Sequence, residues 1–341
     1  KHEYNDYIPL EKLPSVSVCI PVRNEHHAIA ECLELVLASD YPKMEVIVLD
    51  DESVDNTSDI IRSFAHAGVR FIKGDKLPRG WIGKNKAFEK LTSEASGEYI
   101  LFLSVDTKIQ PRDISTLIRY TEQHQLGMIG VMPQRRNFHI NVIFGTMRFL
   151  WELVLQSRSL PATSTSAWMV KADELKRYGN FWENHRAVIR PETSLAKLFY
   201  DQQQYRFLIA NKFLSIGQEK KWRSQLATTV RTSSRIFSQS PYLRASILVI
   251  LASIIISTGV IIFNLITSTT SWIKIVSSLI LFGFGLTYCQ FTRLAWRKAW
   301  FLGLISWIWT VPQELFLLVI SILRSNLHIL SWKGRRLPFI R

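Results

Sequence analysis

The sequence predicts an α/β domain built on a mostly parallel β-sheet, followed by helices that cross a membrane. Three observations support this prediction. Apolar segments typical of strands alternate with amphipathic helical segments through the first half of the 341 residues. Polar residues directly follow several of those strands. The longest stretches without a charged residue lie toward the C-terminus.

The first half of the chain reads as a regular alternation of strands and helices. The expected strands are Val16–Val22, Glu45–Asp50, Val69–Lys73, Tyr99–Ser104 and Met128–Met132. The expected helices between them are Glu25–Ala38, Val54–His66, Lys84–Ser96 and Asp113–His124. Alternation of this kind favours a mostly parallel sheet with helices on both faces, and such sheets bind ligands at the carboxyl ends of their strands.

Three further helices are expected beyond this alternation. The aromatic-rich stretch Ile140–Gln156 is too short and too charged to span a bilayer, so we expect it to pack on the domain or lie near the membrane. Glu192–Tyr200 is a short helix. Gln218–Phe237 is basic and amphipathic, which suits the lipid headgroup region. The expected division is a domain of residues 1–225 and a membrane region of residues 226–341.

Two stretches, Ala245–Ile273 and Ile275–Thr292, contain no charged residue. Each is about as long as the 18 or more residues that a spanning helix needs. Ala299–Leu323 is a third apolar stretch, interrupted by Pro312-Gln313-Glu314. The sequence therefore predicts spans at about 245–266 and 275–292, with a broken or re-entrant segment at 299–323.

The positive charge is concentrated in the last third of the chain. The formal net charge is +14, and Gln218–Arg341 contributes 15 Lys and Arg against two acids, or +13, which leaves +1 for residues 1–217. A basic excess around apolar spans is typical of cytoplasmic flanks facing anionic lipid. The near-neutral first part argues against nucleic acid as the partner. We therefore expect a multi-pass membrane protein with its α/β domain and basic tail in the cytoplasm.

Polar residues follow three of the expected strands. PVRNE (Pro21–Glu25) follows the first strand, DDESVDNT (Asp50–Thr57) the second, and Asp106 the fourth. Because parallel strands end at the same edge of a sheet, these residues are expected to face a common ligand. Taken singly, each motif is equally typical of a loop that caps the next helix.

Six motifs in order resemble the family 2 glycosyltransferases, which have the nucleotide-sugar-binding GT-A fold. The motifs cover about the first 225 residues and are PVRNE, DDESVDNT, GDKLPRGWIGKNKA, FLSVDT, RPETSLAK and QEKKW. The GWIGK loop together with the apolar C-terminal segments is similar to the branch that glycosylates lipids. That branch includes ceramide glucosyltransferases and carotenoid or hopanoid glycosyltransferases.

The resemblance implies a site for a UDP-sugar donor. Asp51 is expected to contact the uracil or ribose, and Pro21 and Glu25 to shape the same pocket. Lys84 lies where a Gly-Lys pair of the family approaches the nucleotide, and its charge suits a diphosphate.

The resemblance also implies a bound Mn²⁺ or Mg²⁺. Asp106 aligns with the second Asp of the family's DxD motif, which holds the metal on the donor diphosphate. Ser104 stands where the family usually has the first Asp, so its contacts with the donor are expected to be weaker. A hard cation bridging phosphates needs only one or two protein carboxylates.

For the acceptor side, the resemblance assigns Glu192 as the general base in the family's ED-x-x-LA segment, with Pro191 and Glu192 in place of Glu and Asp. In the family's QxxRW pattern, Gln218 and Trp222 are retained and expected to line the acceptor side. Lys221 replaces the arginine and loses its bidentate fork.

The resulting hypothesis is an inverting, metal-dependent enzyme that moves a hexose from a UDP-sugar to the hydroxyl of a membrane lipid. Two alternatives stay open. One is a catalytically inert family member that acts as a membrane-bound binding or assembly protein, which the substitutions at Ser104 and Glu192 suggest. The other is a polysaccharide synthase, against which the small number of spans argues.

Overall fold

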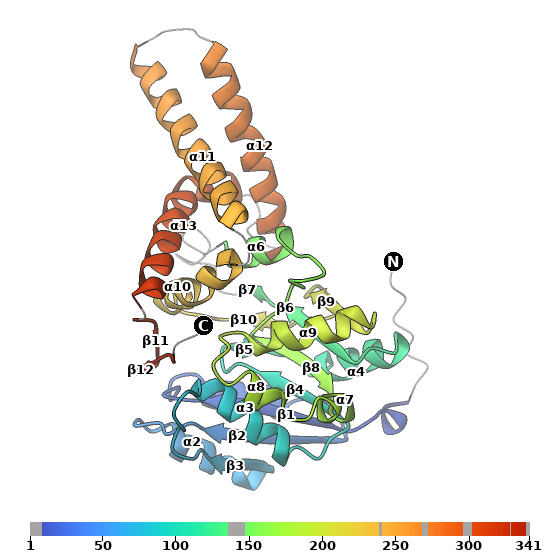
Figure 1. The fold of residues 1–341 in the computed structure, drawn as a ribbon. Coiled ribbons are helices and arrows are strands. Elements are labelled where there is room, and N and C mark those ends of the chain that lie inside the picture. The colour runs from blue at the N-terminus through green and yellow to red at the C-terminus, as the bar shows by residue number, and fades with distance from the viewer. Residues whose placement is uncertain are drawn as a thin grey trace. The chain divides into compact units, whose positions relative to one another are not determined.

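The computed structural model describes residues 9–135, 147–238, 241–267, 272–295, 302–327 and 329–338 (Figure 1). The chain forms two compact units, each made of separate stretches. The first unit, called the sheet unit here, consists of Lys1–Gln134, Leu155–Glu219 and Ser331–Arg341. The second, called the helical unit, consists of Arg135–Val154 and Lys220–Leu330.

The sheet unit contains a seven-stranded sheet with the order β3-β2-β1-β4-β8-β6-β9. Strands β1, β2, β3 and β4 run parallel to one another, and β6 is parallel to β9. Strand β8 is antiparallel to both of its neighbours. The predicted mostly parallel α/β sheet is therefore confirmed. The strands are β1 Val16–Val22, β2 Met44–Asp50, β3 Val69–Lys73, β4 Tyr99–Leu103, β6 Met128–Met132, β8 Ala167–Lys171 and β9 Tyr205–Ile209.

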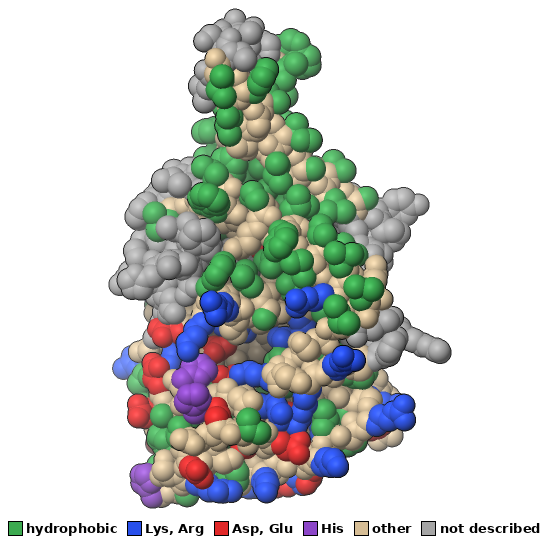
Figure 2. Space-filling view, turned by 90° about the vertical axis from the view of Figure 1, so that its left-hand side faces the viewer, with side chains coloured by type: hydrophobic (Ala, Val, Ile, Leu, Met, Phe, Trp, Pro, Cys, Tyr) green, Lys and Arg blue, Asp and Glu red, His purple; other side chains and the backbone are tan. Residues whose placement is uncertain are grey.

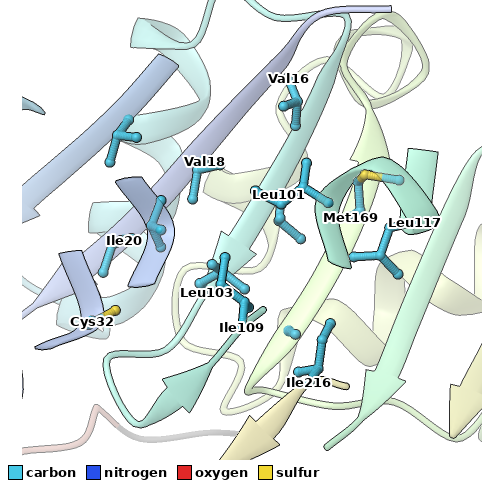
Figure 3. Packing of buried hydrophobic residues seen from close by; sticks show 14 of the residues in the cluster. Val16, Val18, Ile20, Cys32, Leu101, Leu103, Ile109, Leu117, Met169 and Ile216 are labelled. Atoms are coloured by element: carbon cyan, nitrogen blue, oxygen red, sulfur yellow. The ribbon is translucent and has the colours of Figure 1, made fainter. Parts of the chain in front are cut away.

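Side-chain alternation along the strands gives the sheet two apolar faces. On β1, Val18 and Ile20 point into one buried cluster, whereas Cys19 points into the other. Figure 3 shows the first cluster, in which Leu101 lies beside Val18 and Leu117 lies beside Met169. Helices α1 (Ile29–Leu37), α2 (Thr57–Ser63) and α4 (Asp113–Gln123) cover this face, and α3 (Gly83–Glu94), α7 (Ala172–Arg177), α8 (Phe181–Asn184) and α9 (Pro191–Asp201) cover the opposite one.

An aromatic cluster fixes α3 against the second face. Phe102 of β4 stacks on Trp168 of β8 with ring centroids 4.2 Å apart, and Phe88 of α3 packs edge-on against both. Trp182 of α8 completes the cluster and donates its indole N–H to Thr92. Each buried ring of this size contributes roughly 2–3 kcal/mol. This packing sets the position of the N-terminus of α3 at the sheet edge.

Short strands lie outside the large sheet. Thr107–Lys108 (β5), Gly217–Gln218 (β10) and Gln134–Arg135 (β7) form a small sheet in the order β5-β10-β7. Ser331–Trp332 (β11) and Arg335–Arg336 (β12) form an antiparallel pair, called the C-terminal hairpin here. Between them, Lys333 and Gly334 have φ values of 48° and 81°, which is typical of a tight two-residue hairpin turn.

The helical unit contains α6 (Arg148–Val154), α10 (Trp222–Ser238), α11 (Pro241–Thr267), α12 (Trp272–Ala295) and α13 (Gly303–Asn326). Among the described residues, two segments are long and apolar enough to cross a membrane, Trp272–Leu294 and Ser306–Asn326, and Ile247–Phe263 is a shorter apolar helix. Hydrophobic side chains gather over this unit in Figure 2, whereas charged ones gather over the sheet unit. Its exposed apolar residues include Val249, Ile256, Ile262, Phe282 and Phe316.

Several expected elements differ in the structure. The break predicted near Pro312 is wrong, because α13 continues through this proline. A proline removes only one hydrogen bond from a helix, and a packed apolar helix tolerates that loss. Gln218 lies in β10 rather than in a helix, and the helix begins only at Trp222. Pairing of β10 with β5 overrides the helical pattern there.

Other expectations hold in part or lie outside the described residues. The expected helix Ile140–Gln156 is described only from residue 147, where α6 occupies Arg148–Val154. Strands β8 and β9 were not predicted. The expected domain boundary near residue 225 stays a prediction.

Candidate functional site

The carboxyl ends of three neighbouring parallel strands form one edge of the sheet. Val22 pairs with Asp50 across β1 and β2, and Cys19 pairs with Phe102 across β1 and β4. The amide of Asp51 donates to the carbonyl of Val22 at 2.8 Å, which joins the loops after β1 and β2. The segments that carry Pro21, Glu25, Asp51, Ser104 and Asp106 therefore leave the sheet from neighbouring strands.

Asp51 is buried and held by an arginine from the opposite end of the chain. Its side chain is 7% exposed, and Nη1 of Arg335 lies 2.8 Å from both carboxylate oxygens. Burial raises the pKa of Asp51, whereas the hydrogen bonds and charge of Arg335 lower it, and the net direction is upward. One nitrogen serves both oxygens, so each oxygen keeps a lone pair for a further donor.

The N-terminus of α3 lies directly against this pair. A Cβ on Gly83 would fall 2.4 Å from Oδ2 of Asp51 and 2.9 Å from Nη1 of Arg335, so any larger residue would displace the ends of these two side chains. The next residue, Lys84, has its Nζ 4.9 Å from the centroid of Phe88. The GWIGK segment thus places Gly83 against Asp51 and puts the cationic Lys84 next to it in the first turn of α3.

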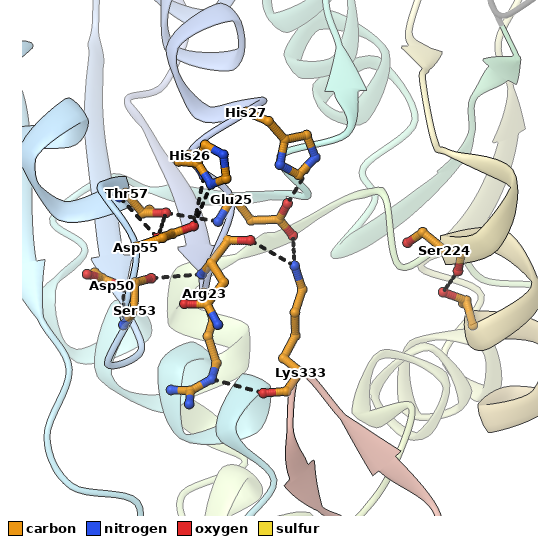
Figure 4. A network of polar contacts seen from close by, with 12 residues as sticks. Arg23, Glu25, His26, His27, Asp50, Ser53, Asp55, Thr57, Ser224 and Lys333 are labelled. Carbon is orange, nitrogen blue, oxygen red and sulfur yellow. Dashed lines mark hydrogen bonds and ion pairs between the residues drawn. The ribbon is translucent and has the colours of Figure 1, made fainter.

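A network of ion pairs and hydrogen bonds links Glu25 and Arg23 to Lys333 of the C-terminal hairpin (Figure 4). Nζ of Lys333 lies 2.7 Å from Glu25 and donates to the carbonyl of Asn24 at 3.2 Å. Arg23 donates to the carbonyls of Asp51, Glu52 and Lys333. The loops after β1 and β2 and the C-terminal hairpin are therefore joined through charged side chains. Asp50, in contrast, bonds Ser53 and Ser58 within its own loop.

The loop after β4 is joined to β10. The amide of Ser104 donates to the Ser166 carbonyl at 2.8 Å, and the amide of Glu219 donates to the Asp106 carbonyl at 2.9 Å. Nε2 of Gln218 donates to Oγ of Ser166, also at 2.8 Å. These bonds fix the backbone around Asp106, whose side chain is partly exposed. Asp106 and Gln218 thus lie in one cluster of loops.

Within the described ranges, no group of three His, Cys, Asp or Glu side chains is placed to hold a metal ion. A cage made by the protein alone therefore does not fit these residues. A single partly exposed carboxylate on a fixed backbone, as at Asp106, fits a hard cation whose other ligands are phosphate oxygens and water. The metal implied by the sequence would thus arrive with, or be retained by, a phosphorylated ligand.

Glu192 occupies the first turn of α9, after Pro191 at its first position. Its side chain is 1% exposed, and Nε of Arg190 lies 3.2 Å from its carboxylate. Nη2 of Arg190 also donates to the carbonyl of Thr163 at 3.1 Å and to its hydroxyl at 2.5 Å. The arginine thus holds the Glu192 carboxylate at the N-terminus of α9. Acting as a base requires this ion pair to open.

The remaining acceptor-side candidates belong to the helical unit. Trp222 begins α10 and is 36% exposed, and the carbonyl of Lys221 accepts the amide of Gln225. Gln218, in contrast, belongs to the sheet unit. The sequence interpretation gave no site role to Gly83, Arg23, Arg190, Lys333 or Arg335. The basic WKGRR tail was the available signal for the last two, and we interpreted it as a flank facing lipid.

A seven-stranded α/β sheet with carboxylates at the ends of β2 and β4 is the architecture of a GT-A glycosyltransferase. The fold matches the solved mannosyltransferase PcManGT from Pyrobaculum calidifontis, in complex with GDP-Man and Mn²⁺, with a TM-score of 0.57. That match covers 98% of this chain and 92% of the other at 19% identity. Residues 17–171 match the family described as Glycosyl transferase family 2. Over these residues, slightly less than half of its length, the chain is similar to glycosyltransferases of this family.

Curated relatives agree over shorter stretches. The 4,4'-diaponeurosporenoate glycosyltransferase of Staphylococcus aureus (strain bovine RF122 / ET3-1) is 30% identical over 132 residues, which is 38% of this chain and 33% of that protein. The probable glycosyltransferase YdaM of Bacillus subtilis (strain 168) is 36% identical over 101 residues, or 28% of this chain and 24% of that one. The chain thus spans about a third or less of the length of these two relatives.

Proposed function

We propose that this glycosyltransferase moves a hexose from a UDP-sugar to the hydroxyl of a membrane lipid, with inversion at the anomeric carbon. The observation that carries the proposal is the arrangement of Asp51 and Asp106 after β2 and β4, the two parallel strands that flank β1. One buried carboxylate suits the base or ribose of a nucleotide. The other, partly exposed, suits a cation on its diphosphate.

In the proposed reaction, the acceptor hydroxyl attacks the anomeric carbon of the sugar from the face opposite the leaving group. A carbon–oxygen bond forms to the acceptor, the bond from the anomeric carbon to the diphosphate oxygen breaks, and UDP leaves with the electron pair. Glu192 takes the hydroxyl proton. Asp106 would hold a divalent cation, which would supply positive charge to the departing diphosphate. A single displacement of this kind inverts the configuration.

The ion pair between Arg190 and Glu192 shapes the proposed role of the base. As long as Arg190 donates to Oε1 of Glu192, this oxygen is engaged by the guanidinium and is less available to an acceptor hydroxyl. Because bound donor and acceptor would place new polar groups beside Glu192, we propose that Arg190 shifts from Glu192 when both substrates are present. Unproductive hydrolysis of the donor would be limited in the same way.

A lipid acceptor is proposed on two grounds. Two segments, Trp272–Leu294 and Ser306–Asn326, are long and apolar enough to cross a bilayer. One of the relatives bears the name 4,4'-diaponeurosporenoate glycosyltransferase, and the carotenoid in that name suggests a lipid acceptor. The basic excess of the last third of the chain favours a multi-pass protein whose catalytic domain faces the cytoplasm. Pro21, Lys84 and Ser104 are proposed to line the donor pocket, and Gln218, Lys221 and Trp222 the acceptor side.

A catalytically inert binding protein is the second candidate, favoured by Ser104 and by the ion-paired Glu192. Binding of UDP to the detergent-purified protein, with and without Mn²⁺, separates the two. Metal-dependent binding that is lost in Asp106→Ala, together with UDP release when a donor and lipid are supplied, supports the transferase. Weak UDP binding that does not depend on Mn²⁺, with no UDP release from any donor, supports the hypothesis of an inert binding protein.

A further inference from the structure

The C-terminal hairpin belongs to the sheet unit, although the chain reaches it only after the last helix of the helical unit (Figure 1). Its two strands are short, and its turn residues Lys333 and Gly334 adopt the left-handed backbone that a tight hairpin requires. The hairpin presents Lys333 and Arg335 to the loops after β1 and β2. Arg336, the next residue after Arg335, is exposed.

The hairpin supplies the cations that pair with carboxylates of the loops after β1 and β2. Lys333 pairs with Glu25, and Arg335 pairs with Asp51 and Glu52. Arg23 of the loops donates instead to the backbone carbonyls of Asp51 and Glu52. Without the hairpin, these three carboxylates would lose their cationic partners at the place proposed for a nucleotide diphosphate. Like charges at such short range oppose binding of an anion.

Arg335 holds the Asp51 carboxylate and leaves hydrogen-bonding capacity on it for a ligand. Nη1 of Arg335 donates to both carboxylate oxygens, and its Nη2 turns to Glu52. Each oxygen of Asp51 therefore retains the capacity to accept a second hydrogen bond, such as one from a ribose hydroxyl or a base N–H. The backbone of Gly83 lies directly against the Asp51–Arg335 pair.

We infer that the C-terminal hairpin is part of the donor site, with Arg335 and Lys333 as positioning residues that orient Asp51 and Glu25 and neutralise them toward an anionic nucleotide. This inference rests on the proposed function, because it takes a UDP-sugar as the ligand. Arg335 acts through Asp51, and Lys333 acts through Glu25. Neither residue is assigned a part in the bond-making step.

The test is UDP binding by the full-length protein, measured by titration calorimetry in detergent with Mn²⁺ present. Arg335→Ala is expected to weaken UDP binding by about tenfold or more, since it leaves a buried carboxylate without its partner. Lys333→Ala is expected to weaken binding less, because Glu25 is more exposed. The matched control is Arg336→Ala, which removes the same charge from the same hairpin and is expected to bind UDP as the unaltered protein does.

The pH dependence of binding supplies a readout that a merely structural role would not move. Asp51 faces the cations Arg335 and Arg23 and the carboxylate Glu52. Loss of Arg335 removes a cation that lowers the Asp51 pKa. The pH at which UDP binding fails on acidification is therefore expected to rise in Arg335→Ala, to return most of the way in Arg335→Lys, and to stay unchanged in Arg336→Ala.

The outcomes separate the inference from the proposed function. If the unaltered protein binds UDP and Arg335→Ala binds it equally well, the hairpin has no part in the donor site. Tighter binding by Arg335→Ala would show that the hairpin obstructs the site, which also overturns the inference. If the unaltered protein binds no UDP, the proposed function fails and the inference fails with it. Thermal unfolding of every variant identifies any that do not fold, and Lys333→Ala then decides the question independently.

Discussion

Nε of Arg190 lies 3.2 Å from the carboxylate of Glu192, and both side chains are buried, 6% and 1% exposed. The proposed general base is thus paired with the residue two positions before it. This arrangement links a catalytic expectation to a stability expectation, because the same contact serves both.

Glu192→Gln is expected to lower glycosyl transfer by about 100-fold or more, since a positioned general base contributes that much. UDP binding is expected to stay within about twofold, because Gln is nearly isosteric and Glu192 lies outside the proposed donor pocket. Transfer assays with lipid acceptor and UDP titrations check the two expectations. Glu183→Gln, at an exposed ion pair with Arg186, is the matched control. Turnover retained in Glu192→Gln would remove this residue from the mechanism.

Arg190→Met is expected to destabilise the protein by about 3–5 kcal/mol, because it leaves Glu192 buried without its positive partner. Chemical denaturation of the purified protein measures this change in the free energy of unfolding. The double variant Arg190→Met with Glu192→Gln is expected to recover part of the loss, because the buried charge is gone. Arg158→Ala, at an exposed pair with Asp201, is the control and should unfold as the unaltered protein does. Equal stability of Arg190→Met and Arg158→Ala would contradict the prediction.

Asp106→Ala is expected to abolish the increase in UDP affinity that Mn²⁺ produces. The reason is that the described residues offer no cluster of three metal-binding side chains, so a cation retained with the diphosphate depends on this carboxylate. Titrations with Mn²⁺ alone should show weak binding, and titrations with Mn²⁺ and UDP together should show strong binding. Asp173→Ala removes an exposed carboxylate of α7 and serves as control. If Mn²⁺ still raised the UDP affinity of Asp106→Ala, the metal would have to bind at a different residue.

Gly83→Ala is expected to weaken UDP binding, because the new methyl group would collide with both members of the Asp51–Arg335 pair. Gly259→Ala in α11 is the matched substitution, since nothing lies within 4 Å of the added Cβ. That control should leave binding unchanged and, within a helix, slightly raise stability. Calorimetric titration of both variants with UDP is the measurement. Unchanged UDP affinity in Gly83→Ala would contradict the prediction and would show that the Asp51 and Arg335 side chains can shift to make space for the methyl group.

Glu314 is expected to stabilise the helical unit. Its carboxylate accepts the Met147 amide at 2.8 Å and the indole N–H of Trp151 at 3.3 Å. Glu314→Ala leaves both buried donors without an acceptor, at a cost of about 1–3 kcal/mol for each. Thermal unfolding in detergent should show a lower midpoint for Ala than for Gln, which keeps one acceptor. Equal midpoints for both variants and the unaltered protein would rule out this role.

The sequence predicted the first four parallel strands because each carries its own apolar pattern and is bounded by polar loops. The sequence did not predict β8 and β9. Strand β8 forms by pairing with β4 and β6, and β9 forms by pairing with β6, although neither has a clear local strand pattern. The sequence pattern also placed Gln218 in a helix, where pairing with Thr107 makes a strand. Local periodicity predicts an element well when packing agrees with it, and fails where distant pairing decides.

The carboxylates at the sheet edge followed from the fold class, because the carboxyl ends of parallel strands meet. Their cationic partners did not. Arg335 lies 284 residues after Asp51, and in the sequence its charge was indistinguishable from that of a flank facing lipid. The pair between Arg190 and Glu192 is close in sequence, yet it becomes significant only once both side chains are seen to be buried.

The sheet unit is assembled from three stretches of chain, and its last stretch is Ser331–Arg341. Those residues leave the ribosome after α11, α12 and α13 have been made. A nascent chain can form the large sheet early, but the partner of Asp51 does not yet exist at that stage. Pairing of Asp51 with Arg335 therefore has to wait until the helical unit has been synthesised. A chain interrupted before residue 331 would carry the strands of the large sheet without the hairpin that holds Asp51.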